Sequence, residues 1–380
     1  MEFKDIQQKI IVSLLENPLK SLKELSENVS LSVPTLKKRL QEMYDDKIII
    51  AINAHPKVEE LGLKRVHVIS TIKNKNYLKI FEKACDLHPY TRYRSTAIGT
   101  TFNCYSQFEI PDNETALDLL ELYFQKLYQL NIILDYKIYK GDGFTYHIYP
   151  NLSKYNPDDG WMFDWDSWNT TLINARDTLS VKVQTAMAEK NKAKIDPTEF
   201  TPLRFDILRY CSIDGTIKQS VLTKKTDLQL SKSEANRQYN YVKDNMVDSF
   251  ELYYNRNYFD LNDTNIFFIT NVNKQKQAKL MNTLLDNPPP FRFSIDLLEN
   301  NSIFLYGNLN YKDLYRFVDS LWSEFDEIEM YRLNSSIDSS IRYYFWPDNF
   351  DFEKKTWKID YDYMLTNPIN EIKNDLNVKP

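Results

Sequence analysis

The sequence predicts an α+β protein with two winged helix-turn-helix domains, each followed by a ferredoxin-like βαββαβ domain. The pattern Trp-x-apolar-Asp-aromatic-Asp occurs at 161–166 and again at 357–362, an offset of 196 residues. The apolar strand pattern at 66–69 recurs at 266–269. Each half also opens with helical periodicity before its alternating segments begin. A duplicated two-part unit is the simplest account of these matches.

We expect this duplication to divide the chain into six segments. They are a winged helix-turn-helix at 1–63, a ferredoxin-like domain at 64–168, a linker at 169–200, a second winged helix-turn-helix at 201–262, a second ferredoxin-like domain at 263–362 and a polar, loose tail at 363–380. The charged stretch at 182–194 is interpreted as a helical connector between the halves.

Composition limits the function classes. The 380 residues contain only seven glycines, and no glycine-rich phosphate loop is present. The three cysteines and four histidines are scattered, so we expect no disulfide framework, no metal site and no cofactor. No signal peptide or membrane-spanning apolar run is found, which predicts a cytoplasmic protein. The net charge of -5 means that any contact with nucleic acid must come from local patches.

The first fifty residues predict a helix-turn-helix. Ser21 and Glu24 have the spacing of a capping box, and Ser32 begins a third helix with Pro34 in its first turn. The apolar residues Leu36, Leu40 and Met43 fix the inward face of that helix. The predicted DNA-binding residues of this unit are Ser32, Thr35, Lys37, Lys38, Arg39 and Gln41. The stretch 48–52 is expected to begin the wing. A solvated face used only for assembly is the alternative.

The second copy repeats this arrangement with a more basic balance. Residues 201–245 hold eight Lys and Arg against five Asp and Glu. Val221-Leu222 belongs to the predicted second helix, and Leu230-Ser231 precedes the third. The inward residues of the third helix are Ala235, Tyr239, Val242 and Met246, and its predicted DNA-binding residues are Lys232, Asn236, Arg237 and Asn240. Residues 250–259 are the expected wing.

The order β-α-β-β-α-β is predicted after each helix-turn-helix. In the first half the expected strands are 66–69, 91–98, 101–110 and 132–139, with helices at 77–87 and after Asn113. In the second half they are 266–272, 291–298, 302–306 and 329–333, with helices at 274–285 and 313–325. The alternation within 161–166 and within 357–362 is interpreted as an added strand in each half, with aromatics inward and acids outward.

These segments together resemble the Lrp/AsnC family of transcription regulators. The resemblance rests on Leu31-Ser32 before the third helix, on Leu61-Gly62-Leu63, and on the connection Ile49-Ile50-Ala51-Ile52-Asn53-Ala54-His55-Pro56. It implies double-stranded DNA binding by a recognition helix at 32–44. It also implies effector sensing and oligomerisation by the βαββαβ (RAM) domain, and hence a homodimer in which the two RAM-like domains of one chain also pair.

The resemblance places Gly99, Thr101 and Asn103 at the family's small-molecule effector loop. This chain departs from the family there, because no aspartate follows Gly99 and the corresponding turn of the second copy, at 299–301, has no glycine. From the family resemblance as a whole, we expect a regulator that binds DNA and is not an enzyme. Two alternatives stay open. One is a tetrapyrrole enzyme, because siroheme decarboxylases use the same architecture, with His67, Arg92 and Arg94 as candidates. The other is an assembly or sensor module that has lost DNA binding.

Overall fold

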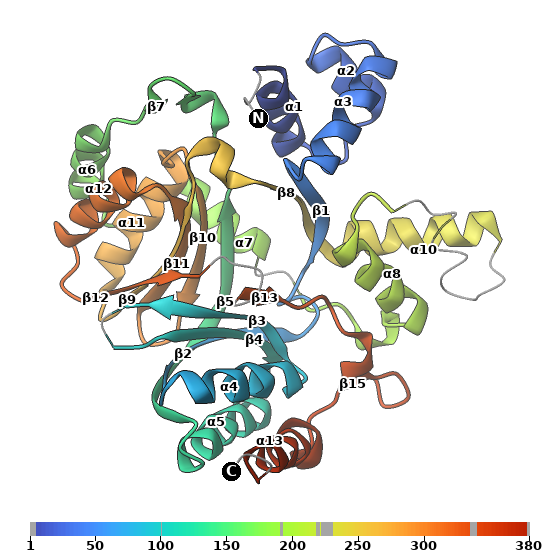
Figure 1. The fold of residues 1–380 in the computed structure, drawn as a ribbon, viewed down its shortest axis with the longest axis vertical. Coiled ribbons are helices and arrows are strands. Elements are labelled where there is room, and N and C mark those ends of the chain that lie inside the picture. The colour runs from blue at the N-terminus through green and yellow to red at the C-terminus, as the bar shows by residue number, and fades with distance from the viewer. Residues whose placement is uncertain are drawn as a thin grey trace.

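The computed structural model describes residues 5–377 except 100, 191–192, 218–220, 222–230 and 335–339. Two groups of helices project from a body built on β-strands, and a two-stranded ribbon joins them to that body (Figure 1). Within the described residues, no helix combines the length and the apolar character that a bilayer crossing requires.

The first winged helix-turn-helix forms as the capping signals predict. Its helices are α1 (Asp5–Glu16), α2 (Leu22–Asn28) and α3 (Val33–Asp45). Ser21 and Glu24 form the predicted capping box, and the Ser32 side chain accepts a hydrogen bond from the Thr35 amide at the start of α3. Leu36 and Met43 are fully buried, so the inward face of α3 is confirmed.

The first βαββαβ unit has the predicted order of elements. It consists of β2 (Leu63–Ile72), α4 (Lys75–Leu87), β3 (Thr91–Ile98), β4 (Cys104–Pro111), α5 (Glu114–Gln129) and β5 (Ile133–Ile148). Asn113 caps α5 by accepting a hydrogen bond from the Ala116 amide. The predicted end of the last strand at 139 is wrong. The strand continues because residues 141–148 leave the first unit and pair with the second.

The second unit repeats the order. It consists of β9 (Asp263–Ile269), α11 (Lys274–Asp286), β10 (Arg292–Leu298), β11 (Ser302–Leu309), α12 (Tyr311–Trp322) and β12 (Ile328–Leu333). The strands of both units join into one antiparallel sheet of order β12-β9-β11-β10-β5-β2-β4-β3-β13. The β13 strand (Ser340–Arg342) extends this sheet at β3. The β12 strand of the second unit also pairs with β3 of the first, so the two units contact each other at this edge as well. The strands of the two units are therefore hydrogen-bonded to one another within the chain, at β5–β10 and at β12–β3.

The second winged helix-turn-helix contains α8 (Pro202–Ile213) and α10 (Lys232–Asn245). The predicted residues Leu222 and Leu230 lie outside the described residues. Ala235, Val242 and Met246 are buried as predicted. The wing strand β8 (Val247–Tyr254) pairs antiparallel with β1 (Ile49–Pro56) of the first wing, so each winged helix is attached to the body through one strand of a shared ribbon.

The two tryptophan segments form hairpins, and each leads into a helix. The first has β6 (Tyr155–Asn156), β7 (Gly160–Trp161) and α6 (Trp165–Asn174); the second has β14 (Phe350–Asp351), β15 (Thr356–Trp357), a π-helix at Asp362–Thr366 and α13 (Asn367–Asn377). The predicted added strands are therefore wrong beyond each tryptophan. Asp164 instead accepts from the Ser167 amide as a helix cap, and Asp360 accepts from the Tyr363 amide.

Each hairpin reaches across to the opposite half. The Trp161 indole donates to the Phe259 carbonyl at 2.7 Å, and the Trp357 indole donates to the Leu61 carbonyl at 2.9 Å. The α6 helix packs on α11 and α12, and α13 packs on α4 and α5. The expectation of a loose tail is wrong, because α13 buries Ile369 and Ile372 in the helical layer of the first unit.

Short elements complete the connections. The predicted helical connector is α7 (Val181–Lys190), which packs on α11 and β5 through the buried Val183. The remaining elements of the described residues are four 3-10 turns at Leu152–Lys154, Pro197–Glu199, Arg256–Phe259 and Pro347–Asn349.

Candidate nucleic-acid interface and ligand cavity

The outward face of α3 carries the residues predicted for DNA. Thr35, Lys37, Lys38 and Gln41 are exposed, and neither lysine forms an ion pair with any described carboxylate. Arg39 is only half-exposed and pairs with Glu42 at 2.7 Å. Gln41 donates to Asp45 at 2.8 Å. Two lysine charges are thus available without breaking an existing pair.

The corresponding face of α10 is more engaged with the protein. Lys232 and Asn240 are exposed. Arg237 is exposed but pairs with Glu234 at 2.8 Å. Asn236, predicted to project outward, is half-buried, and its Oδ1 lies inside without a hydrogen-bond partner among the described residues.

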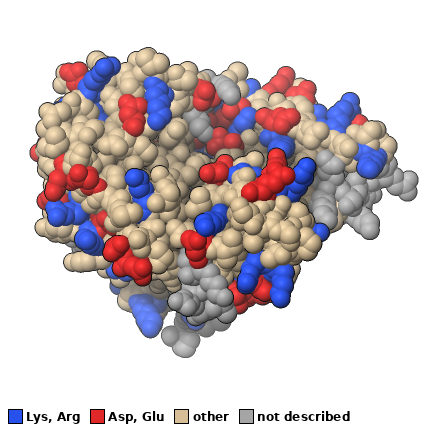
Figure 2. Space-filling model, turned by 90° about the horizontal axis from the view of Figure 1, so that it is seen from above, with Lys and Arg blue, Asp and Glu red and all other residues tan. Residues whose placement is uncertain are grey.

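Surface charge is mixed over the face seen from above. Figure 2 shows Lys and Arg interspersed with Asp and Glu on this face, with no broad field of one sign. A contact with phosphate on this face would therefore have to come from a few local cations, as the net charge implies.

The predicted effector loop lies at the seam between β3 and β12. A Cβ on Gly99 would stand 2.1 Å from the Tyr331 ring, so the chain approaches β12 too closely for a larger residue. The Thr101 carbonyl accepts from Thr71, and the Asn103 side chain accepts from the Ile72 amide. These contacts hold the turn in place. An effector role for Gly99, Thr101 and Asn103 stays a prediction.

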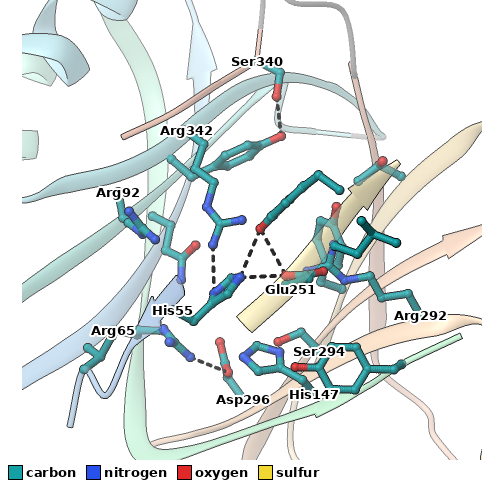
Figure 3. A pocket seen from close by; sticks show the side chains of 18 of the residues that line it. His55, Arg65, Arg92, His147, Glu251, Arg292, Ser294, Asp296, Ser340 and Arg342 are labelled. Carbon is teal, nitrogen blue, oxygen red and sulfur yellow. Dashed lines mark hydrogen bonds and ion pairs between the residues drawn. The ribbon is translucent and has the colours of Figure 1, made fainter. Parts of the chain in front are cut away.

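A polar cavity of about 300 Å³ lies between the two units, beneath the β1–β8 ribbon. Figure 3 shows charged side chains converging on it from strands of both units and from the ribbon. Its lining includes five arginines, Arg65, Arg92, Arg256, Arg292 and Arg342, and three carboxylates, Glu109, Glu251 and Asp296. Cations therefore outnumber anions in the lining.

One group of arginines comes from β2, β3 and β13. Arg65 lies 3.5 Å from Asp296 and 3.7 Å from Glu109, and Arg92 lies 3.4 Å from the same Glu109. Arg342 has no described carboxylate within ion-pair distance, and its side chain is accessible from the cavity. Burial and then the charge of nearby Arg92 lower the pKa of Arg342 to about 10.

A second group surrounds Tyr306 on β11. Arg292 pairs with Glu251 at 2.6 Å, and Arg256 contacts the Tyr306 hydroxyl at 3.5 Å without a carboxylate partner among the described residues. Burial opposes ionisation of Tyr306, but Arg256 and Arg292 outweigh it and lower the pKa of that phenol to about 8.

His55 on β1 connects the two groups. Its Nε2 lies 2.7 Å from Glu251, and its Nδ1 lies 3.1 Å from the Arg342 guanidinium. Burial and then Arg342 lower the pKa of His55 to about 3, so the ring is neutral and both contacts fit the tautomer protonated at Nε2. The Tyr253 hydroxyl also donates to Glu251. The ribbon is thus tied to the body by charged contacts.

The candidates named for a tetrapyrrole site separate in the structure. Arg92 lines the cavity. His67 is fully buried behind the wall, with Nε2 3.0 Å from Asp296 and Nδ1 2.8 Å from the Tyr105 hydroxyl. Arg94 faces away and pairs with Asp86 at 2.6 Å. The cavity residues missed from sequence are charged residues within otherwise apolar strands, such as Arg292 and Asp296, and that contrast was the available signal.

No group of three or more His, Cys, Asp or Glu side chains with metal-binding geometry is found among the described residues. One histidine of the cavity has an unused polar atom. His147 on β5 has a buried Nδ1 without a partner in the described part of the chain, and burial, followed by the charge of Arg65, lowers its pKa to about 4.

Comparison with known proteins places this geometry in context. Residues 3–50 match the model of winged helix-turn-helix DNA-binding domains. The siroheme decarboxylase NirDL has a similar structure over 98% of this chain and 99% of that chain, with a TM-score of 0.51 and 10% identity. This likeness shows a shared fold. No curated protein sequence matches the chain.

Two shorter structures are also similar in part. A transcriptional regulator of Neisseria meningitidis in complex with L-Met is 24% identical, with 36% of this chain and 88% of that chain covered and a TM-score of 0.32. AsnC of E. coli is 17% identical, with 36% and 91% covered and a TM-score of 0.30.

Proposed function

We propose that this chain is a DNA-binding transcription regulator of Lrp/AsnC type that acts by binding and not by catalysis. The observation that carries the proposal is the first winged helix, where residues 3–50 match a DNA-binding model. There α3 presents Thr35, Lys37 and Lys38 outward on a helix whose opposite face is buried. A helix held in this way can enter the major groove while its cations contact phosphate.

Lys37 and Lys38 are assigned to phosphate, because ammonium groups on long flexible stems neutralise backbone charge without reading sequence. Thr35 and Gln41 are assigned to base edges, with Ser32 and Arg39 at the border of the contact. In the second unit, Lys232, Arg237 and Asn240 are proposed as weaker contacts. Asn236 is the least suited of the set, since its side-chain oxygen is buried.

The test is a salt titration of Lys37→Ala/Lys38→Ala against wild type on the protein's own promoter DNA. Each lost phosphate contact flattens the plot of log affinity against log salt by about 0.9, so the double variant should lose about two units of slope. It should weaken all sequences alike.

Lys75→Ala/Lys79→Ala is the matched control, because it removes two exposed lysines of α4, at the opposite end of the molecule from α3 (Figure 1). Equal affinity and slope for both double variants and wild type would rule out α3 as a DNA reader. The assembly-module interpretation would then replace the regulator.

A tetrapyrrole enzyme is the second candidate, and two observations favour it. The likeness to NirDL spans the whole chain, and that protein has also been solved with an iron-uroporphyrin III analogue. The cavity also offers five arginines that suit carboxylate side groups. Its volume is at the lower end of the range for ligand pockets, which favours a smaller ligand. A shift of the visible absorption band of iron-uroporphyrin III on mixing with the protein, lost in Arg92→Gln, would support this candidate.

Tandem duplication and homodimerisation belong to the same proposal. The two halves share one order of elements and exchange equivalent tryptophan contacts, which supports duplication. Light scattering that gives the mass of two chains would support the homodimer, and the mass of one chain would leave only the internal pairing.

A further inference from the structure

We propose that the cavity beneath the β1–β8 ribbon binds a small ligand with two anionic groups, of short-dicarboxylate size, and that its binding shifts the ribbon that carries both winged helices. The regulatory half of this inference rests on the proposed function. The binding half does not, and it can be tested without DNA.

Two unpaired guanidiniums indicate two anionic groups. Among the five arginines of the lining, Arg65, Arg92 and Arg292 each have a carboxylate within 4 Å. Arg342 and Arg256 have none among the described residues. One belongs to each of the two arginine groups, and the His55–Glu251 pair connects these groups, because His55 contacts Arg342 and Glu251 pairs with Arg292 (Figure 3). Arg342 is exposed and Arg256 is half-buried, so an anion that enters the cavity can reach both guanidiniums.

The cations also repel one another. Burial disfavours the charged form of Arg342, and Arg92 and Arg65 add to that effect. Arg92 likewise has a lowered pKa because of burial, with Arg65 acting in the same direction. The carboxylates Glu109 and Glu251 offset this repulsion only in part, and a bound anion would reduce it further.

Size and wall chemistry narrow the ligand. The volume of about 300 Å³ suits a compact molecule. The ring of Tyr253 lies between the arginine groups, with Arg292 and Arg342 both over it, and Tyr306 adds an aromatic ring within the second group. The buried Nδ1 of His147 is an unused acceptor or donor. A short chain with a carboxylate at each end matches this arrangement.

Ligand binding would affect the ribbon because the contacts that hold the ribbon to the body use arginines of the cavity. Arg342 contacts His55 of β1, and Arg292 pairs with Glu251 of β8. A carboxylate on Arg342 competes with the Arg342–His55 contact, and Arg256, which holds the second carboxylate, lies in the turn directly after β8 beside Arg292 and Tyr306. Binding therefore changes how the ribbon is tied to the body, and both winged helices move with it.

The first experiment measures binding by thermal unfolding of the full chain in succinate, glutarate or the monoanion butyrate at constant ionic strength. Glutarate or succinate at about 100 times its Kd should raise Tm by about 3 °C or more, and butyrate should not. Arg342→Gln and Arg256→Gln should each lose the rise. Arg316→Gln is the matched control, because Arg316 is an exposed arginine of α12 outside the cavity.

The second experiment measures anisotropy of labelled promoter DNA with and without glutarate. Wild type should change its DNA affinity at least about threefold, whereas Arg342→Gln should bind DNA like ligand-free wild type and show no response. Absence of any Tm rise with both dicarboxylates overturns the binding half, and a rise with iron-uroporphyrin III alone assigns the cavity to the second candidate.

The two halves of the inference fail separately. A Tm rise with unchanged DNA affinity, in a protein whose Lys37→Ala/Lys38→Ala variant does weaken DNA binding, overturns the coupling. If that double variant has no effect on DNA, the proposed function fails, while the Tm comparison still decides the ligand site.

Discussion

The space between the strands of the first unit and those of the second has two ends with opposite chemistry. At the end away from the ribbon, aromatic and aliphatic side chains fill it, among them Phe102, Phe268 and Tyr331. At the end beneath the ribbon, strands of both units contribute arginines, carboxylates and an unfilled volume. Phe304 of β11 touches both, because it stacks on His67 and also lines the cavity.

This difference indicates which end contributes more to the stability of the fold. Apolar packing stabilises the pairing of the two units, whereas enclosed charges cost desolvation energy and contribute little net stability. The polar end is therefore expected to contribute less net stability than the packed end. Substitutions at the two ends should reveal this contrast.

The largest effect is expected at the packed end. Phe268 is fully buried against Tyr139 and Phe304, so Phe268→Ala should lower the free energy of unfolding by about 3–5 kcal/mol. Urea denaturation of the full chain measures the loss. Tyr311→Ala, which removes an aromatic side chain that is 76% exposed, should change it by less than about 0.5 kcal/mol. If the two variants lost similar free energies of unfolding, the packing of Phe268 would not be what stabilises this end.

A smaller, pH-dependent effect is expected at the polar end. The pKa of His147 falls to about 4 in the folded chain because of burial and then Arg65, whereas an unfolded histidine titrates near about 6.5. Below that pH the unfolded chain binds a proton that the folded chain does not, so stability falls as pH decreases toward 4.

His147→Gln should therefore reduce the loss of stability between pH 7 and pH 5 by about 2 kcal/mol. Urea denaturation at the two pH values measures it. His55 and His88, whose pKa values are also lowered by burial, stay in the variant and supply the remaining dependence. An identical pH dependence in variant and wild type would contradict a neutral His147.

The smallest effect is expected for the cation without a carboxylate partner. Arg342→Gln should change the free energy of unfolding by less than about 1 kcal/mol, or raise it, because no ion pair is broken and a repulsive charge is removed. Arg292→Gln should instead cost about 3 kcal/mol, since it leaves Glu251 buried without its cation. Denaturation curves for both variants make the comparison, and a large loss in Arg342→Gln would show that this arginine supports the fold.

Much of the fold follows from local signals. The capping residues Ser21, Ser32 and Asn113 mark where α2, α3 and α5 begin, and Thr91 to Ile98 forms a strand with the predicted bounds. The errors arise where long-range pairing decides. The β5 strand continues past Gly141 because β10 supplies hydrogen bonds that local sequence does not reveal.

The site was less predictable than the fold. The exposed face of α3, which is proposed to contact DNA, could be derived because one helix contains both its apolar stripe and its cations. The cavity draws residues from ten strands, from α1 and from the turn after β8, and no spacing in the chain links Arg65 to Arg292 or Arg342. The alternation in 161–166 also led to a wrong prediction of a strand, because Asp164 is a helix cap and not an outward strand residue.

The helices α6 and α13, each of which packs on the opposite unit, have a consequence for the synthesis of the chain. The helical layer of the first unit, α4 and α5, is covered by α13 near the end of the chain, and α6 of the first half covers the second unit. Synthesis proceeds from the N-terminus, so the first unit leaves the ribosome long before its cover exists. Its apolar layer stays open to water until residues 367–377 have been synthesised. The packing of the first unit is therefore completed only after the second unit has been made.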